Sequence, residues 1–88
     1  MKANDKPVPR DDVMFRELED GCVIYDPKTE KVHSLNVTAA TIWCMLDGNT
    51  SASDIAQNIA ERTNADMSVV LADVIRTIED FGKQGLLK

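Results

Sequence analysis

The sequence predicts a compact α+β domain in which a three-stranded antiparallel sheet precedes three helices. The arrangement resembles a winged helix-turn-helix whose wing lies at the N-terminal side. Two turn signals divide the region between Met14 and Leu35 into three short β-rich segments. From Asn36 onward, apolar residues recur every three or four positions, as on one face of a helix. A run of strands followed by a run of helices is typical of the α+β class.

The chain has 88 residues and a formal net charge of −5. This length allows one small domain with little capacity for a deep catalytic cavity. The acidic balance argues against binding along a nucleic-acid backbone, which requires clustered lysine and arginine. No apolar run approaches the roughly 20 residues that span a bilayer, and the N-terminus lacks the apolar core of a signal peptide. We therefore expect a cytoplasmic protein that binds neither nucleic acid nor a membrane.

Residues 1–12 are expected to form a flexible tail, and residues 13–88 the folded domain. The tail combines prolines and mixed charges with very few apolar side chains. Asp20-Gly21 indicates a tight hairpin turn, and Asp26-Pro27 begins a second turn. The strands that these turns separate are predicted at 14–18, 22–25 and 31–35.

Three helices are expected after the strands, and each begins at a residue that can cap it. Asn36 and Ser51 offer side-chain oxygens to backbone N–H groups in the first turn, and the third helix begins near Asp66. Trp43 lies on the apolar stripe of the first helix, where a core anchor is the expected role. Gly85 is placed to end the third helix in the left-handed conformation.

No catalytic or metal-binding constellation is evident in the sequence. Cys22 and Cys44 are expected to be two buried reduced thiols, because they lie far apart without a CxxC pairing. The single His33 completes no metal site with them at any standard spacing. Asp73 and Asp80 are one heptad apart, which indicates a solvated helix face rather than an acid/base pair. We therefore predict a protein that is not an enzyme and uses no cofactor.

The third predicted strand, Lys31–Leu35, is the candidate binding element on physical grounds. In a meander of consecutive strands it lies at an edge of the sheet. An edge strand presents unpaired N–H and C=O groups with which an extended peptide can pair. An ordinary edge blunted by Lys31 and His33 is the alternative, and the residues alone leave both interpretations open. An exposed edge can also mediate a homodimer.

A specific combination of residues follows this strand. It comprises Leu35-Asn36-x-Thr38-Ala39-x-x-Ile42-Trp43-x-x-Leu46-Asp47-Gly48 and then Ser51-x-x-Asp54-Ile55. This segment resembles the PqqD-like family, small proteins related to pyrroloquinoline quinone synthesis protein D. The resemblance covers roughly residues 14–88, and its further parts are Tyr25-Asp26-Pro27, Asp73-Val74 and Gly85-Leu86-Leu87.

The resemblance implies a peptide recognition element that binds the leader segment of a ribosomally made precursor peptide. Such domains present the leader to a modifying enzyme, often a radical S-adenosylmethionine protein. The leader adds as a strand beside the third strand, in a groove against the third helix. The peptide-binding residues expected here are Lys31, Val32, His33, Ser34 and Leu35 on the strand and Val70, Asp73 and Thr77 on the helix.

The pathway stays open, because Ile42-Trp43 looks closer to the broad stand-alone class than to the authentic quinone-cofactor member. A winged-helix DNA-binding regulator is the alternative function suggested by the order of the helices. A recognition helix carries arginine or lysine at base-facing positions. The third predicted helix has only Arg76 and Lys83 against three acidic residues, which disfavours this alternative.

Overall fold

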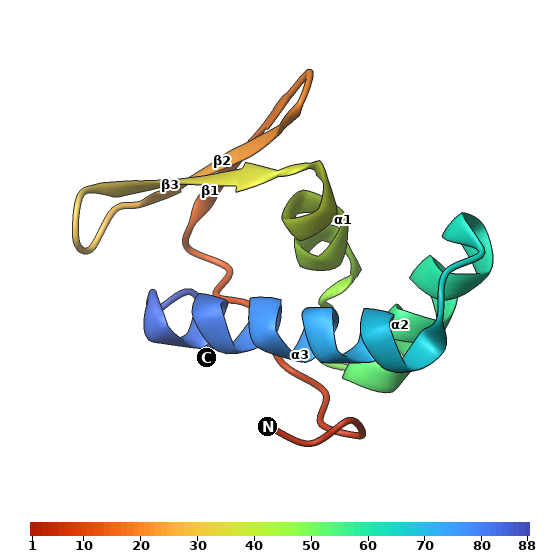
Figure 1. Ribbon diagram of the computed structural model, residues 1–88. Helices are drawn as coiled ribbons and strands as arrows, with labels where there is room; N and C mark the ends of the chain where they lie inside the picture. The colour runs from red at the N-terminus through yellow and green to blue at the C-terminus, as the bar shows by residue number, and fades with distance from the viewer.

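A computed structural model describes residues 1–88 and contains a three-stranded sheet followed by three helices (Figure 1). The elements in chain order are β1 (Met14–Leu18), β2 (Gly21–Asp26), β3 (Lys31–Asn36), α1 (Val37–Met45), α2 (Ala52–Thr63) and α3 (Met67–Lys83). The α+β architecture predicted from the sequence is confirmed, and each predicted strand agrees with the observed one to within a residue. None of the three helices is both long and apolar enough to cross a membrane.

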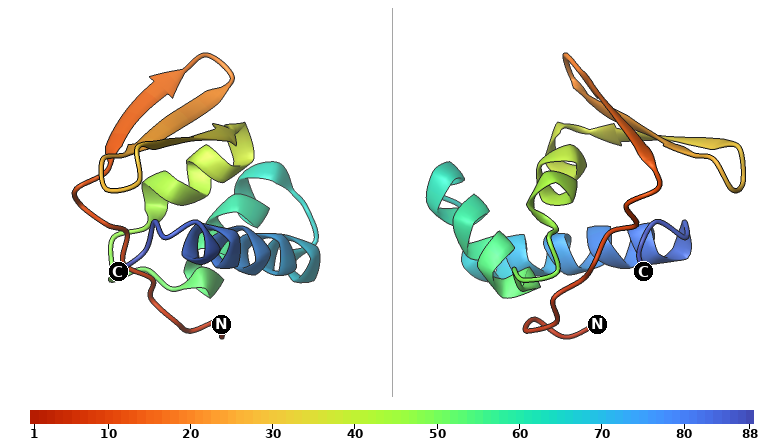
Figure 2. Two further views of the ribbon diagram at one scale, coloured as in Figure 1. Left: turned by 90° about the vertical axis from the view of Figure 1, so that its left-hand side faces the viewer. Right: turned by 180° about the vertical axis from the view of Figure 1, so that it is seen from behind.

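The sheet is an antiparallel meander in the order β1-β2-β3, so that β1 and β3 are both edges. Two residues join β1 to β2, and Leu18 lies opposite Gly21 at the end of the hairpin. All the helices lie on one side of the sheet, as the three views together show (Figures 1 and 2). Cys22 and Ile24 of the central strand point to that side and are buried, because the helices cover them.

The core lies between the inner face of the sheet and the three helices, and α2 contributes Ala52, Ile55, Ala56 and Ala60 to it. Trp43 of α1 meets Phe81 of α3 edge to face, with ring centroids 5.3 Å apart and an interplanar angle of 88°. Edge-to-face contact is a favoured geometry for two aromatic rings. The expectation that Trp43 anchors the core is confirmed by its burial.

The predicted caps hold each helix at its N-terminus. The Asn36 side chain accepts a hydrogen bond from the Ala39 N–H at 2.9 Å, which fixes the point where β3 turns into α1. The Ser51 hydroxyl oxygen accepts from the Asp54 N–H at 3.0 Å at the start of α2. Asp66 caps α3, as its position predicted.

The end of α3 is a Schellman motif, as the terminal glycine predicted. Gly85 has a φ of 74°, which is the left-handed region that glycine adopts without a steric cost. The Leu86 N–H donates to the Phe81 carbonyl at 3.0 Å, and the Gly85 N–H donates to the Gly82 carbonyl at 3.1 Å. Leu86 is thereby brought into the core, which closes the sheet end of α3.

Residues 1–12, expected to form a flexible tail, lie across the helices in defined contacts; we call this segment the N-terminal strap. Its carbonyl groups at Ala3 and Asp5 accept hydrogen bonds from Ser53 at 2.8 Å and Ala52 at 3.1 Å. These two N–H groups belong to the first turn of α2 and have no partner within the helix. The strap therefore completes the cap of α2 through its backbone, which a prediction from apolar content does not detect.

The strap also pairs with the C-terminus of the chain. The Lys88 N–H donates to the Val8 carbonyl at 2.8 Å, and the Arg10 N–H donates to the Leu86 carbonyl at 2.9 Å. The Arg10 guanidinium contacts the buried Asp26 carboxylate at 2.8 Å. Hydrogen bonding to Arg10 outweighs the opposing effect of burial and lowers the pKa of Asp26 to about 2.

The expectation that both cysteine thiols are buried is wrong for Cys44. Cys22 is buried on the inner face of the sheet, and burial raises the pKa of its thiol. Cys44 is exposed instead. Helix α1 carries apolar or weakly polar residues on nearly every side, so its periodicity did not distinguish the face that meets solvent.

Candidate functional site

Strand β3 is a sheet edge with few of its side chains covered. Lys31, Val32 and Ser34 are exposed, and the Val32 residue retains 63% of its accessible surface. His33 and Leu35 are partly covered because they lie on the inner face, opposite Ile24 and Cys22 of β2. The Nε2 atom of His33 is buried without a hydrogen-bond partner.

The backbone of β3 has one row of groups turned toward β2 and one row turned away. The two-residue hairpin between β1 and β2 closes on the pair Leu18–Gly21, which in this loop type is hydrogen-bonded. Pairing alternates along antiparallel strands. Cys22 and Ile24 consequently direct their backbone groups toward β3, and the backbone groups of Val32 and Ser34 point away from the sheet. These outward groups can accept a further strand.

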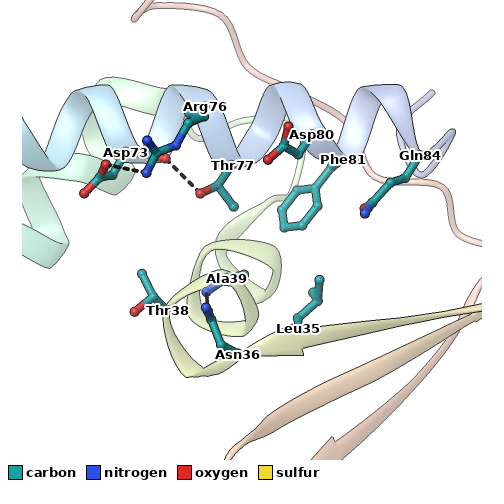
Figure 3. Close-up of a pocket in the computed structure, with 10 residues that line it drawn as sticks. All are labelled: Leu35, Asn36, Thr38, Ala39, Asp73, Arg76, Thr77, Asp80, Phe81 and Gln84. Carbon is teal, nitrogen blue, oxygen red and sulfur yellow. Dashed lines mark hydrogen bonds and ion pairs between the residues drawn. The ribbon is translucent and has the colours of Figure 1, made fainter.

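A groove of about 420 Å³ lies beside the end of β3 and the start of α1, with α3 as its opposite wall. Figure 3 shows Phe81 and Leu35 pointing toward each other from the two walls. The residues that line the groove are Leu35, Asn36, Thr38, Ala39, Asp73, Arg76, Thr77, Asp80, Phe81 and Gln84.

The groove has an apolar part and a charged rim. Leu35, Ala39 and Phe81 supply the apolar surface. On the rim, Arg76 contacts the Asp73 carboxylate at 2.9 Å across one turn of α3 (Figure 3). An arrangement of this kind suits an extended chain with alternating side chains better than a reaction, because it offers hydrogen-bonding groups and an apolar contact but no nucleophile paired with a base.

The side chains that were expected to bind a peptide occupy three different places. Leu35, Asp73 and Thr77 line the groove, whereas residues 31–34 follow the edge that leads away from it. The Thr77 hydroxyl donates to the Asp73 carbonyl at 2.8 Å and so faces its own helix. Val70 was expected to line the groove side of α3. It is 9% exposed and belongs to the core instead, together with the other apolar residues of α3.

Sequence reasoning missed seven of the lining residues. Four belong to α3 or its C-terminal cap, and the spacing of Arg76, Asp80 and Gln84 repeats every four residues along one face. The helical period could therefore have placed them beside Asp73. The other three lie where β3 passes into α1, and only the capping bond of Asn36 indicates that turn in the sequence. These seven are Asn36, Thr38, Ala39, Arg76, Asp80, Phe81 and Gln84.

The remaining titratable groups form no second site. No three histidine, cysteine, aspartate or glutamate side chains lie close enough together to hold a metal ion. Arg10 and Asp26 are joined to each other and lie in the contact between the strap and the sheet, since Arg10 also donates to the Gly85 carbonyl at 2.9 Å. The groove between β3 and α3 is thus the place where open backbone groups and an unfilled hollow come together.

Comparison with solved structures finds the same fold in three chains, each at a TM-score of 0.83. The PqqD portion of PqqCD from Methylobacterium extorquens, described as a stand-alone RiPP recognition element, is 22% identical over 99% of this chain and 93% of that one. TbiB1 in complex with the TbiA(beta) leader peptide is 20% identical over 92% of this chain and 94% of that one. Lasso peptide synthetase B1, complexed with the leader peptide, is 20% identical over 94% and 98%.

No protein in the comparison with curated sequences matches the chain. The solved structures, at 20–22% identity, share the fold of this chain. A family model matches residues 21–87, from the start of β2 to the penultimate residue. The chain therefore belongs to the PqqD family, whose model is described as coenzyme PQQ synthesis protein D.

Proposed function

We propose that this protein is a non-catalytic adaptor that binds the leader segment of a ribosomally synthesised precursor peptide. The leader adds as a fourth strand at the outer edge of β3, with alternate side chains directed into the groove against α3. The observation that carries the proposal is the open edge of β3 beside an unfilled groove. Strand addition uses such an edge for affinity and adjoining pockets for specificity.

The backbone supplies the register of the bound leader. Val32 and Ser34 offer one N–H and one C=O each to the added strand, and their exposed side chains leave the approach open. Lys31, His33 and Leu35 alternate with them and turn their side chains toward the helices. All five strand residues are therefore assigned to the leader contact, and Asp73 and Thr77 of α3 form the opposite wall.

The apolar part of the groove supplies selectivity for the leader. Leu35 is partly exposed in the groove, whereas Phe81 is already buried, so an apolar leader side chain that packs against Leu35 removes its own surface and that of Leu35 from water. A leader without an apolar residue at that position loses this contribution. The recognition domain comprises residues 13–88, and the strap supports it from the opposite side of the helices.

The adaptor presents its leader to a modifying enzyme, and a radical S-adenosylmethionine protein is the partner that we infer. Support comes from the family and from relatives of the same fold that are described with leader peptides. The protein itself supplies no chemistry in this scheme and needs no cofactor. We place it in the cytoplasm, where the exposed Cys44 stays reduced. Homodimer formation through an exposed edge stays a prediction.

The alternative function, a winged-helix DNA-binding regulator, has less support. Arg76 is the only cation that lines the groove face of α3, and it is paired with Asp73. Asp80 lies on the same face. A helix with this charge pattern repels phosphate groups rather than attracting them.

An NMR titration tests the proposed function. The ¹⁵N-labelled full chain is titrated with the leader segment of the precursor peptide encoded beside its gene, and with the same residues in scrambled order. We expect amide shifts at 31–36 and 73–84 for the leader only. Shifts confined to other residues, or equal shifts with the scrambled peptide, would overturn the proposal. Salt-dependent binding to duplex DNA would revive the alternative.

A further inference from the structure

The charges on the rim of the groove do not cancel. Asp73 and Arg76 form an ion pair with a distance of 2.9 Å between Oδ1 and Nη2. Asp80 lies further along the same face of α3 and lines the groove, and it takes part in none of the ion pairs of the molecule. The groove thus holds one carboxylate without a partner.

The position of Asp80 in its helix adds to the negative potential. Asp80 lies in the last turn of α3, and the C-terminus of a helix carries a partial negative charge of its own. Lys83 lies in the same turn but does not line the groove, and neither Lys83 nor Arg76 is paired with Asp80. The end of the groove nearest Gln84 is therefore suited to a cation.

The carboxylate lies beside the apolar contact. Phe81 follows Asp80 directly in the chain, and its ring points down toward Leu35 while the Asp80 carboxylate stays on the rim (Figure 3). Side chains two positions apart on one face of a strand are about 6.7 Å apart. An extended peptide with an apolar residue against Leu35 therefore directs the side chain two positions away into the same groove, where a lysine or arginine stem is long enough to reach Asp80 on the rim.

We propose that the groove selects leader segments in which a lysine or arginine lies two positions from the apolar residue that packs against Leu35, with Asp80 as the residue that determines this preference. The inference rests on the proposed function, since it names the chemistry of the peptide bound at that site. An acidic side chain at the same position meets an uncompensated carboxylate and is rejected.

A phage-displayed library of random dodecapeptides tests the preference over all sequences at once, so the experiment does not depend on which leader the protein binds. The full chain is compared with Asp80→Lys and with Glu61→Gln, which changes an exposed carboxylate on α2 away from the groove. The wild type and Glu61→Gln are expected to enrich peptides with an apolar residue and a lysine or arginine two positions away. Asp80→Lys is expected to lose the preference for a basic peptide residue and to enrich peptides with aspartate or glutamate at that position.

Fluorescence anisotropy with one enriched peptide measures the size of the effect. Asp80→Asn is expected to weaken binding by about two- to fivefold, the range of a solvent-exposed ion pair. The peptide with glutamine in place of its basic residue should bind wild type and Asp80→Asn equally. Because the contact is electrostatic, roughly 0.5 M NaCl should remove the difference. Asp80→Asn retains the size of the side chain, so its melting temperature checks that the fold is unchanged.

The outcomes separate this inference from the proposed function. Enriched peptides that shift the amides of β3 but carry no basic preference, or that bind Asp80→Asn as tightly as wild type, would overturn the role of Asp80 alone. Failure to enrich any peptide with the wild type would overturn both.

Discussion

The N-terminal strap and β3 are both extended segments, but they differ in how their backbone groups are used. The strap forms hydrogen bonds with other parts of the chain, whereas the outer edge of β3 is left open. Residues 3–10 donate or accept hydrogen bonds along the start of α2 and the C-terminus. The outward groups of Val32 and Ser34 at β3 have no such partner in the chain. The molecule therefore holds one extended segment of its own against the helices and leaves the outer edge of β3 open.

The charged groups of the two regions differ as the backbone groups do: those of the strap are paired within the molecule, and one of those in the groove is not. At the strap, the Arg10 guanidinium satisfies the buried Asp26 carboxylate and a carbonyl at the end of α3, so the charges are matched inside the molecule. At the groove, Asp80 is left without an ion pair, and Leu35 and Phe81 line a hollow that the chain itself does not fill. The strap is thus part of the scaffold, and we infer that the groove is completed by a separate molecule.

Replacing Phe81 by alanine should damage both the core and the groove and gives the largest expected effect. Phe81 is 1% exposed, packs against Trp43 and also lines the groove. Removing a buried phenylalanine costs about 3–5 kcal/mol of stability, which urea denaturation measures directly. Phe15→Ala on β1 is the matched control, because Phe15 is 43% exposed and should cost far less. Equal losses for the two variants would contradict the assigned core.

Ser34→Pro should weaken leader binding at the β3 edge without destabilising the rest of the fold. Proline removes the N–H of Ser34, which faces away from β2, and its ring obstructs an incoming strand. The added strand loses a hydrogen bond and suffers a steric clash, so leader binding should weaken by roughly ten- to a hundredfold. Isothermal titration calorimetry gives the dissociation constants. Ser34→Ala keeps the N–H and should bind within about twofold of wild type.

An unchanged affinity of Ser34→Pro would show that β3 is not the docking edge. A large fall in its melting temperature would show instead that the Ser34 N–H pairs with β2. In that case Val32→Pro, whose N–H lies in the same outward row, should also destabilise the sheet.

The sequence predicted the elements that have local signals. Asp20-Gly21 located the first hairpin, Asn36 and Ser51 marked two helix starts, and Gly85 marked the end of α3, because turns and caps depend on a few neighbouring residues. The α+β order followed from these. Apolar spacing also placed Trp43 correctly in the core.

Features that depend on packing between distant segments were not predictable from local patterns. Val70 was expected beside the groove, but it lies in the core that α3 forms with the other two helices. The contact of Arg10 with Asp26 joins residues 16 apart whose charges alone do not indicate a pair. Asp80 was expected only to be solvated, and its position in the groove depends on where β3 ends.

Deleting residues 2–8 should weaken the scaffold and spare the groove. The deletion removes the carbonyl groups that cap α2 and the Val8 carbonyl that pairs with Lys88, and it keeps Arg10 with its contact to Asp26. We expect the melting temperature to fall by about 5–10 °C, and the affinity for a leader peptide at a temperature where the variant is folded to change by less than about twofold. Differential scanning calorimetry and anisotropy report the two quantities. An unchanged melting temperature would show that the segment is the flexible tail that its composition predicts.

Acid should weaken the contact between the strap and the sheet. The pKa of Asp26 is lowered to about 2 from its ordinary 3.8, chiefly by hydrogen bonds from Arg10. A carboxyl whose pKa is depressed by folding stabilises the protein fully above its unfolded pKa and loses that contribution as the pH falls through the folded value. Urea midpoints measured from about pH 5 to pH 2 should therefore fall most steeply between about 4 and 2. Asp26→Asn and Arg10→Ala should both be less stable than the wild type at about pH 5, and their urea midpoints should fall less steeply with pH, because each variant lacks the interaction that acid removes from the wild type. Urea midpoints that fall as steeply as those of the wild type would mean that other carboxyl groups control the acid transition.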